Sequence, residues 1–328
     1  MRWVSAIVGW SVALSLALMP APLVVAQDYS YPSHTVRLIA PAAPGGNPDV
    51  LGRLLADRFA DAMGAPFVVE NVPGAGGIVA ANLVAKAPPD GYVLMLGDSG
   101  SLAINPAINS SLSYNPLNDF APITALATLP TVLVVNPSVP ANTLAEFVAL
   151  AKSKPNQLNY GSAGTGSIHH LTMAIFADRA GISLQHVPYR GGSAMVSGLL
   201  TGEIQAGWSG IPNVKPLIAS GQLRAYCVSV LERSGSLPEI PTCAELGFPG
   251  FDIATMLGLQ APAGTPPKIV AHLQAEAARA MRDPTMIERT TQLGMVMQEK
   301  GTAQYAQFIK DDIERYAAAI RKLNLQIQ

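Results

Sequence analysis

Apolar and polar positions along the chain predict strands that alternate with helices. The β-branched run VRLIA at 36–40 is followed by the turn PAAPGG and by a helix that begins favourably at Asn47 and Pro48. Apolar positions from Leu51 to Ala62 lie on one face of this helix, opposite its charged positions. The same succession recurs in FVVEN, VPGAGG and IVAANLVAKA, which is typical of an α/β fold with a mostly parallel sheet.

The pattern restarts near Pro130 with TVLVVNPS and continues through further strands and helices, so we expect a second lobe with its own sheet. Two amphipathic helices follow at about 268–281 and 302–323, and we expect them to pack on the first lobe. The chain would then cross between the lobes near 129–135 and 253–260. The predicted division is 1–26 for a signal peptide, 27–129 plus 254–328 for lobe 1, and 130–253 for lobe 2.

The N-terminal residues predict a secretory signal. One early cation, Arg2, precedes an apolar run at about 6–19, and small residues near its end suit cleavage after Ala26. A membrane anchor, the alternative, needs about 20 uninterrupted apolar residues, whereas two prolines interrupt this run. We therefore expect a periplasmic protein.

The charge of the chain and its two cysteines indicate which partners, cofactors and cross-links to expect. The 328 residues include 21 Lys+Arg and 22 Asp+Glu without a basic run, so we expect no nucleic-acid partner. Cys227 and Cys243 lie in the exported part, where an oxidising compartment permits a disulfide; two separate buried thiols are the alternative. Their spacing is not CxxC, and we expect no metal and no other cofactor.

Three glycine-rich turns, PAAPGG, YGSAGTGS and PYRGGS, each follow a predicted strand and open a predicted helix. Helix N-termini present unpaired N–H groups and the positive end of the helix dipole, and glycine lets a ligand approach the backbone. Ligands of parallel α/β sheets gather at the carboxyl ends of the strands, where these turns are expected. We expect at least two of them to line a carboxylate site, although each could be a plain turn.

The stretch GDSGS at 97–101 nearly matches the nucleophile motif of chymotrypsin-like proteases. Those enzymes are β-barrels with the triad order His, Asp, Ser, whereas here only His34 precedes the serines and strands alternate with helices. We instead expect Asp98 to hold a turn by accepting backbone N–H groups. Ser99 and Ser101 become candidate donors to a bound acid, with turn capping as the alternative.

Other catalytic motifs are incomplete. The chain has no GxSxG motif, and the GAGG turn lacks the small third residue of a nicotinamide fingerprint because Val79 stands there. The adjacent His169 and His170 point in different directions on a helix, so we expect one to face the cleft and the other solvent or core.

Motifs in a fixed order along nearly the whole mature chain resemble the Bug-type solute receptors of tripartite tricarboxylate transporters. They include VRLIAPAAPGGNPDVLGRLLA, VVENVPGAGGIVAANLVAKAPPDGYVLMLG, LNYGSAGTGSIHHL, HVPYRGG, LPEIPTCAELGFPGF and GLQAPAGTPPKIV. The resemblance implies a two-lobed, type II-like periplasmic-binding-protein fold that closes on a small organic carboxylate and delivers it to membrane permease subunits. It implies no catalysis, and we expect a monomer. The alternative is an exported α/β enzyme that acts on a small organic acid.

The resemblance also implies ligand-binding positions in three segments. These are Ala43, Gly45 and Gly46 in the first turn, Ser162, Gly164, Thr165, Gly166, Ser167 and His170 in the second-lobe loop, and Tyr189, Arg190 and Gly191 in PYRGG. Arg190 would pair with a distal carboxylate or remain solvated. Asp49 belongs to the first turn, but we expect it to be structural, since a free acid would repel an anion.

Two departures from the family pattern bear on the ligand. Ala42 and Ala43 follow Pro41 where the family typically has an aromatic residue, so the pocket would be roomier there. Trp208 and Ser209 follow the QAG segment, where an aromatic wall would favour a flat or apolar ligand body. Packing of Trp208 in the core is the alternative. We expect a mono- or dicarboxylate ligand, aromatic acids included.

Overall fold

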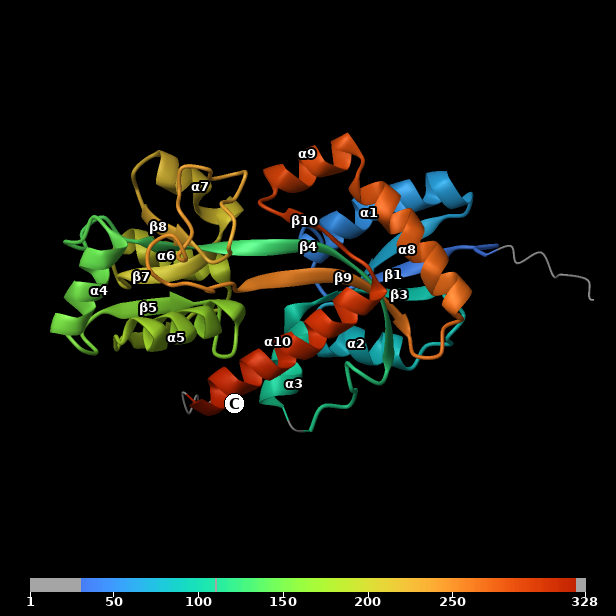
Figure 1. Ribbon diagram of the computed structural model, residues 1–328, viewed down its shortest axis with the longest axis horizontal. Coiled ribbons are helices and arrows are strands. Elements are labelled where there is room, and N and C mark those ends of the chain that lie inside the picture. The colour runs from blue at the N-terminus through green and yellow to red at the C-terminus, as the bar shows by residue number, and fades with distance from the viewer. Residues whose placement is uncertain (1–30, 110, 323–328) are drawn as a thin grey trace, which may run out of the picture. The chain divides into compact units, whose positions relative to one another are not determined.

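The computed structural model describes residues 31–109 and 111–322, whose strands form one continuous sheet (Figure 1). The strand order is β2-β1-β3-β9-β4-β7-β5-β6, and β8 and β10 also pair with β4. The strands are β1 (Val36–Ala40), β2 (Phe67–Asn71), β3 (Val93–Asp98), β4 (Phe120–Val135), β5 (Asn159–Ser162), β6 (Gln185–Pro188), β7 (Ala206–Gly210), β8 (Arg224–Val228), β9 (Ala254–Pro262) and β10 (Val296–Lys300).

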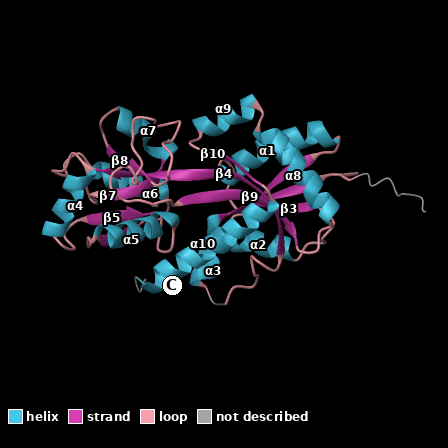
Figure 2. Ribbon diagram, viewed as in Figure 1, coloured by secondary structure: helices cyan, strands magenta, loops and turns pink. Residues whose placement is uncertain are grey.

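Helices alternate with these strands as predicted (Figure 2). They are α1 (Asn47–Met63), α2 (Ile78–Ala85), α3 (Asn105–Ile108), α4 (Leu144–Ser153), α5 (Ile168–Ala180), α6 (Gly192–Thr201), α7 (Ile211–Ala219), α8 (Pro267–Met281), α9 (Pro284–Gln292) and α10 (Thr302–Lys322). The expected helices at 268–281 and 302–323 correspond to α8 and α10. The short helix α9 and the strand β10 were not predicted.

Strand β4 is long enough to join two groups of strands. Up to Pro130 it pairs antiparallel with β9, with Pro130 opposite Ala254. From Thr131 it pairs antiparallel with β7, with Thr131 opposite Gly210. Figure 1 shows β4 and β9 side by side in the middle of the sheet. The change of partners lies at the first predicted crossing, and the division of the chain into two lobes there remains a prediction.

The second half of β4 alternates its side chains between two cores. Leu133 and Val135 pack in a cluster with side chains of α4 and α5, while Val132 and Val134 pack with side chains of α6 and α7. Both faces of this part of the sheet are therefore covered by helices, which explains its uninterrupted apolar sequence.

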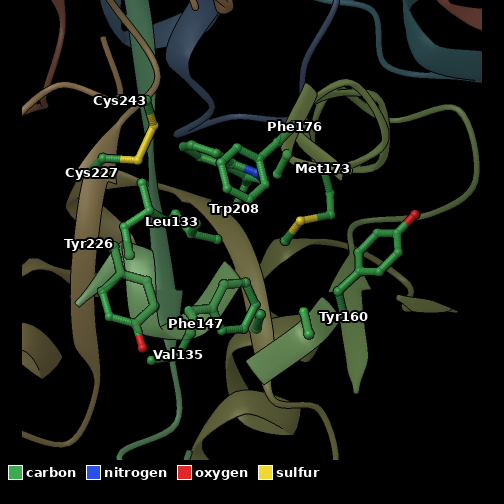
Figure 3. Packing of buried hydrophobic residues seen from close by; sticks show 14 of the residues in the cluster. Leu133, Val135, Phe147, Tyr160, Met173, Phe176, Trp208, Tyr226, Cys227 and Cys243 are labelled. Carbon is green, nitrogen blue, oxygen red and sulfur yellow. A yellow bond between two sulfur atoms is a disulfide. The ribbon is translucent and has the colours of Figure 1, made fainter. Parts of the chain in front are cut away.

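Trp208 lies in the first of these cores, which is the second of the two alternatives that the sequence left open. Its side chain is fully buried and lies beside Phe176 (Figure 3). The ring of Phe251 also stacks on it. A buried indole contributes roughly 1.5–3 kcal/mol or more of transfer free energy. The same region holds a disulfide between Cys227 and Cys243, which appears as the yellow bond in Figure 3.

The helices after β9 pack on the first group of strands. Helix α8 contacts β4 and α1, and α10 contacts β4 and α3. Side chains of α10 share a core with side chains of α2 and β3, with Tyr305 buried among them. Chain contacts group the residues from Pro32 onward into one compact unit.

The predicted signal peptide at 1–26 lies outside the described residues. Among the helices of residues 31–109 and 111–322, none is long and apolar enough to cross a membrane.

Candidate functional site

A cavity of about 290 Å³ lies where β4 changes partners. This volume is near the lower end of small-molecule sites, which run from about 300 to 1,000 Å³. Its walls come from helix starts, strand ends and the α9–β10 turn. The lining residues are Asn47, Pro48, Asp98, Leu129, Pro130, Thr131, Ile168, His169, Gly210, Pro212, Asn213, Thr255, Leu257, Leu293 and Gly294.

Three helices begin at this cavity. Helix α1 contributes Asn47 and Pro48, α5 contributes Ile168 and His169, and α7 contributes Pro212 and Asn213, all from their first turns. The N-terminal N–H groups of a helix attract anions. None of the described lining residues is a lysine or an arginine. The groups of the described lining that can attract an anion are therefore the backbone N–H groups at the helix starts.

Two of the three predicted glycine turns lead into these helices, PAAPGG into α1 and YGSAGTGS into α5. The third, PYRGGS, leads into α6, whose residues do not belong to the described lining. The start of α7 takes its place. Sequence reasoning missed this start, although Gly210 followed by Ile211 and Pro212 after a predicted strand is a helix-start signal.

Asp49 holds the first turn in shape. Its Oδ2 accepts the Gly45 N–H at 2.8 Å, and its Oδ1 accepts a side-chain N–H of Asn71 at 3.0 Å. Arg53 forms an ion pair with the same carboxylate at 2.9 Å. Burial raises the pKa of Asp49, but the bonds from Gly45, Arg53 and Asn71 outweigh it and lower that pKa overall. The prediction of a structural acid is confirmed.

Polar side chains also hold the YGSAGTGS loop between β5 and α5. Ser162 Oγ accepts the Gly164 N–H at 3.1 Å and lies 2.7 Å from His186 Nε2. Ser167 caps α5, because its Oγ accepts the His170 N–H at 3.3 Å. These hydroxyl groups are engaged within the loop.

The two adjacent histidines have different environments. His170 is buried, stacks on His186 at 4.0 Å between ring centroids, and accepts the Gly166 N–H at Nδ1 across 3.0 Å. His169 lines the cavity, and its Nδ1 is buried without a hydrogen-bond partner among the described residues. Burial lowers the pKa of each ring to about 4, so both are neutral at physiological pH. His169 is thus the ring of the pair that faces the cavity, and the ligand-binding role that the resemblance implies for His170 stays a prediction.

The GDSGS segment contains the end of β3 at Asp98, as predicted, but the chain then enters a short π-helix at Gly100–Ile104 that leads into α3 and not a plain turn. Asp98 Oδ1 accepts the N–H and the Oγ–H of Ser101, each at 2.8 Å. The Ser99 hydroxyl is buried and donates to Asp312 at 3.1 Å. Both serine hydroxyls take part in internal bonds, and their predicted role as donors to a bound acid stays a prediction. Of this segment, only Asp98 lines the cavity.

The PYRGG segment also differs from expectation. The Tyr189 ring packs over Gly161 and Gly198, which leave no room for a side chain, and its hydroxyl is buried without a partner among the described residues. The Tyr189 ring is therefore a packing group, and its predicted role as a ligand contact stays a prediction. Arg190 is exposed and does not belong to the cavity lining.

The remaining predicted positions stay predictions. They are Ala43, Gly45, Gly46, Ser162, Gly164, Thr165, Gly166, Ser167, Arg190, Gly191 and Ser209. Several are chain neighbours of the lining, since Asn47 follows Gly46 and Gly210 follows Ser209. Within the described part of the chain, no cluster of three or more His, Cys, Asp or Glu side chains is arranged to hold a metal ion.

The chain is similar to known solute receptors in sequence and in fold. A model of the tripartite tricarboxylate transporter family receptor matches residues 51–325. The periplasmic binding protein BugD is 29% identical with a TM-score of 0.75, and the match covers 91% of this chain and 100% of that one. Rpa4515 of R. palustris, solved with adipate, is 30% identical with a TM-score of 0.79 over 90% and 99% of the two chains. MatC of Rhodopseudomonas palustris, solved with bound malate, is 32% identical with a TM-score of 0.74 over 88% and 100%.

Proposed function

Because the chain belongs to the tripartite tricarboxylate transporter receptor family, we propose that it binds a small organic carboxylate and delivers it to the membrane subunits of such a transporter. As a member of this family of periplasmic transport proteins, it has the α/β periplasmic-binding-protein fold and is a receptor, not an enzyme. The family resemblance seen in the sequence motifs is confirmed, and the alternative of an exported enzyme is excluded.

One observation carries the proposal: the first turns of α1, α5 and α7 line the same cavity, and the described lining has no cationic side chain. Backbone N–H groups and helix dipoles are a sufficient anion site. Adipate and malate, the acids bound by Rpa4515 and MatC, are dicarboxylates of the size that this cavity accommodates. A dicarboxylate is therefore the ligand class that we favour within the wider group of carboxylates.

Isothermal titration calorimetry of the chain from Gln27 onward tests the ligand class. The panel contains aliphatic mono-, di- and tricarboxylates, aromatic acids, and neutral sugars and amines as controls. We expect saturable binding of at least one acid at one site per chain, without consumption of the acid. Binding of a sugar or an amine with no response to any carboxylate would contradict the proposal.

A negative charge placed at a helix start tests where on the protein the carboxylate binds. Asn213→Asp adds a carboxylate in the first turn of α7, where it suits the helix dipole but opposes a bound anion. We expect the affinity for the acid found above to fall by about tenfold or more, which is about 1.4 kcal/mol. Asn142→Asp is the matched control, because Asn142 lies exposed before the start of α4 and outside the cavity lining. Equal affinities of the two variants would remove α7 from the site.

A further inference from the structure

A second cavity, of about 460 Å³, lies on the other face of β4 and β9, and we call it the rear cavity. Successive side chains of a strand point to opposite faces of the sheet. Along β9, Thr255 and Leu257 line the candidate site, whereas Ala254 and Met256 line the rear cavity. The described linings of the two cavities have no residue in common. The rear cavity is the larger one and lies within the size range of small-molecule sites.

The walls of the rear cavity come from the loop that follows β8, from β10 and from α10. Its apolar lining side chains are Val230, Leu231, Met256, Val296, Met297 and Phe308. Leu231 is 53% exposed although it lines this cavity. A ligand with an apolar body would remove this side chain and its neighbours from water, which favours binding.

Lys300, the last residue of β10, is a cation of this lining without an acidic partner. It is half-buried, and its Nζ donates to Gln298 Oε1 at 2.7 Å. Within residues 31–109 and 111–322 it forms no ion pair. The two arginines of the lining are already paired, Arg233 with Glu245 and Arg315 with Asp312. An ammonium group has three N–H donors, so Lys300 keeps donors for an anion.

The two acids of the lining oppose an anion only weakly. Glu232 and Asp252 are both exposed, so water and salt screen their charges. Lys300 has lost part of its hydration, and attraction between opposite charges strengthens where water is excluded. The charge distribution and the apolar walls together favour an anion with an apolar body.

We propose that the rear cavity is a second binding site, for a small amphipathic anion that carries one acid group on an apolar body. The acid group pairs with the Lys300 ammonium group, and the apolar body lies against Met256 and Phe308. Such a ligand contacts the loop after β8 and helix α10 at the same time. The inference goes beyond the proposed function and does not depend on it, because the two cavities have separate linings.

Three probes with the same eight-carbon chain test the inference. Octanoate is an anion, octylammonium is a cation and 1-octanol is neutral, and calorimetry below their micelle concentrations compares their affinities. We expect octanoate to bind at least about tenfold more tightly than either of the other two. No binding of octanoate, or equal or tighter binding of octylammonium or 1-octanol, would overturn the inference.

The variant Lys300→Gln connects the bound anion to its residue, because it removes the charge and keeps a polar side chain. We expect its affinity for octanoate to fall by about fivefold or more, since the ion pair is lost. Lys310→Gln, which removes an exposed cation of α10 outside the lining, is the matched control and should bind octanoate like the wild type. Asn213→Asp alters the candidate site and should also keep the affinity for octanoate.

A loss of octanoate affinity in Asn213→Asp but not in Lys300→Gln would place the anion in the candidate site and overturn the inference. An unchanged affinity in Lys300→Gln alone would also overturn it. Thermal unfolding of all three variants checks that they fold.

Discussion

The hydroxyl group of Ser99 donates a hydrogen bond to the Asp312 carboxylate across 3.1 Å, although the two residues are 213 positions apart. The same oxygen accepts the Met256 N–H at 2.9 Å. Arg315 donates to Asp312 and to the backbone carbonyl of Asp252. These bonds connect the end of β3, the start of β9 and helix α10 beside the position where β4 changes partners.

We expect Ser99→Ala to destabilise the protein by about 1–3 kcal/mol, because it leaves the buried Met256 N–H and one Asp312 oxygen without this partner. Affinity for the ligand should change little, since Ser99 does not belong to the described cavity lining. Urea unfolding measures the first effect and calorimetry the second. Ser197→Ala, an exposed serine bonded only to its own helix, is the control and should leave stability nearly unchanged. A large loss of affinity in Ser99→Ala would instead support Ser99 as a ligand contact.

The Asp49 carboxylate should make stability depend on pH in the acid range. Its net pKa is lowered from the ordinary value of 3.8, so its contribution is full above that value and is lost as pH falls through the lower folded-state pKa. Asp49→Asn should therefore cost about 1.5–3 kcal/mol at neutral pH, the usual strength of hydrogen bonds to a charged group. The difference from the wild type should shrink as the pH is lowered below about 4.

Urea unfolding of both proteins across this range is the measurement. Asp57→Asn, which removes an exposed acid from the same helix, should show no such pH-dependent difference. A constant difference between Asp49→Asn and the wild type at every pH would show that the charge of Asp49 does not hold the turn.

The alternation of strands and helices could be predicted because each buried segment carries its own periodicity. The two C-terminal helices were predicted on the same ground. Helix α9 and β10 are short and partly exposed, and β10 pairs with β4, which is more than 150 residues earlier in the chain. Such a pairing depends on tertiary contacts that no local pattern contains.

The residues of the site were harder to predict than the fold, because the direction of each side chain decides whether it faces the cavity. GDSGS has the composition of a ligand turn, but Ser99 points to Asp312, which lies far away in the sequence. His169 and His170 point in different directions on their helix, but the sequence does not say which of them faces the cavity. The stack of His170 on His186 and its bond with the Gly166 N–H decide this. Trp208 lies within β7 and packs in the core, the alternative that the sequence left open.

The different environments of the two histidines predict different effects of removing each ring. His170→Ala should destabilise the protein by about 2–3 kcal/mol, because the buried stack on His186 is lost and the Gly166 N–H loses its acceptor. His169→Ala removes a ring whose Nδ1 has no partner among the described residues, so no hydrogen bond of that atom is lost. It should instead change the ligand affinity, since His169 lines the cavity.

Urea unfolding and calorimetry on both variants separate these effects. The assignment would be reversed if His170→Ala kept its stability and lost affinity while His169→Ala did the opposite. His34→Ala, which removes an exposed ring stacked on Tyr92 at the beginning of the described chain, is the control for a general effect of losing an imidazole.

The disulfide between Cys227 and Cys243 should stabilise the fold without being required for it. It closes a loop with a sequence separation of 16, for which chain entropy predicts a contribution of about 3 kcal/mol. The segments that it joins are also held by backbone bonds, because Val228 N–H donates to Pro241 and Cys243 N–H donates to Val228. Reduction should therefore lower the urea midpoint of the wild type while leaving a cooperative transition.

Unfolding curves with and without reductant measure this contribution, and the double variant Cys227→Ala, Cys243→Ala provides the control. The urea midpoint of the variant should match that of the reduced wild type, apart from the cost of losing two buried sulfur atoms. Reductant should not change the midpoint of the variant. Because neither cysteine lines the cavity, ligand affinity should be the same with the disulfide formed or reduced. Two free thiols in the unreduced, unfolded wild type would show that the disulfide does not form.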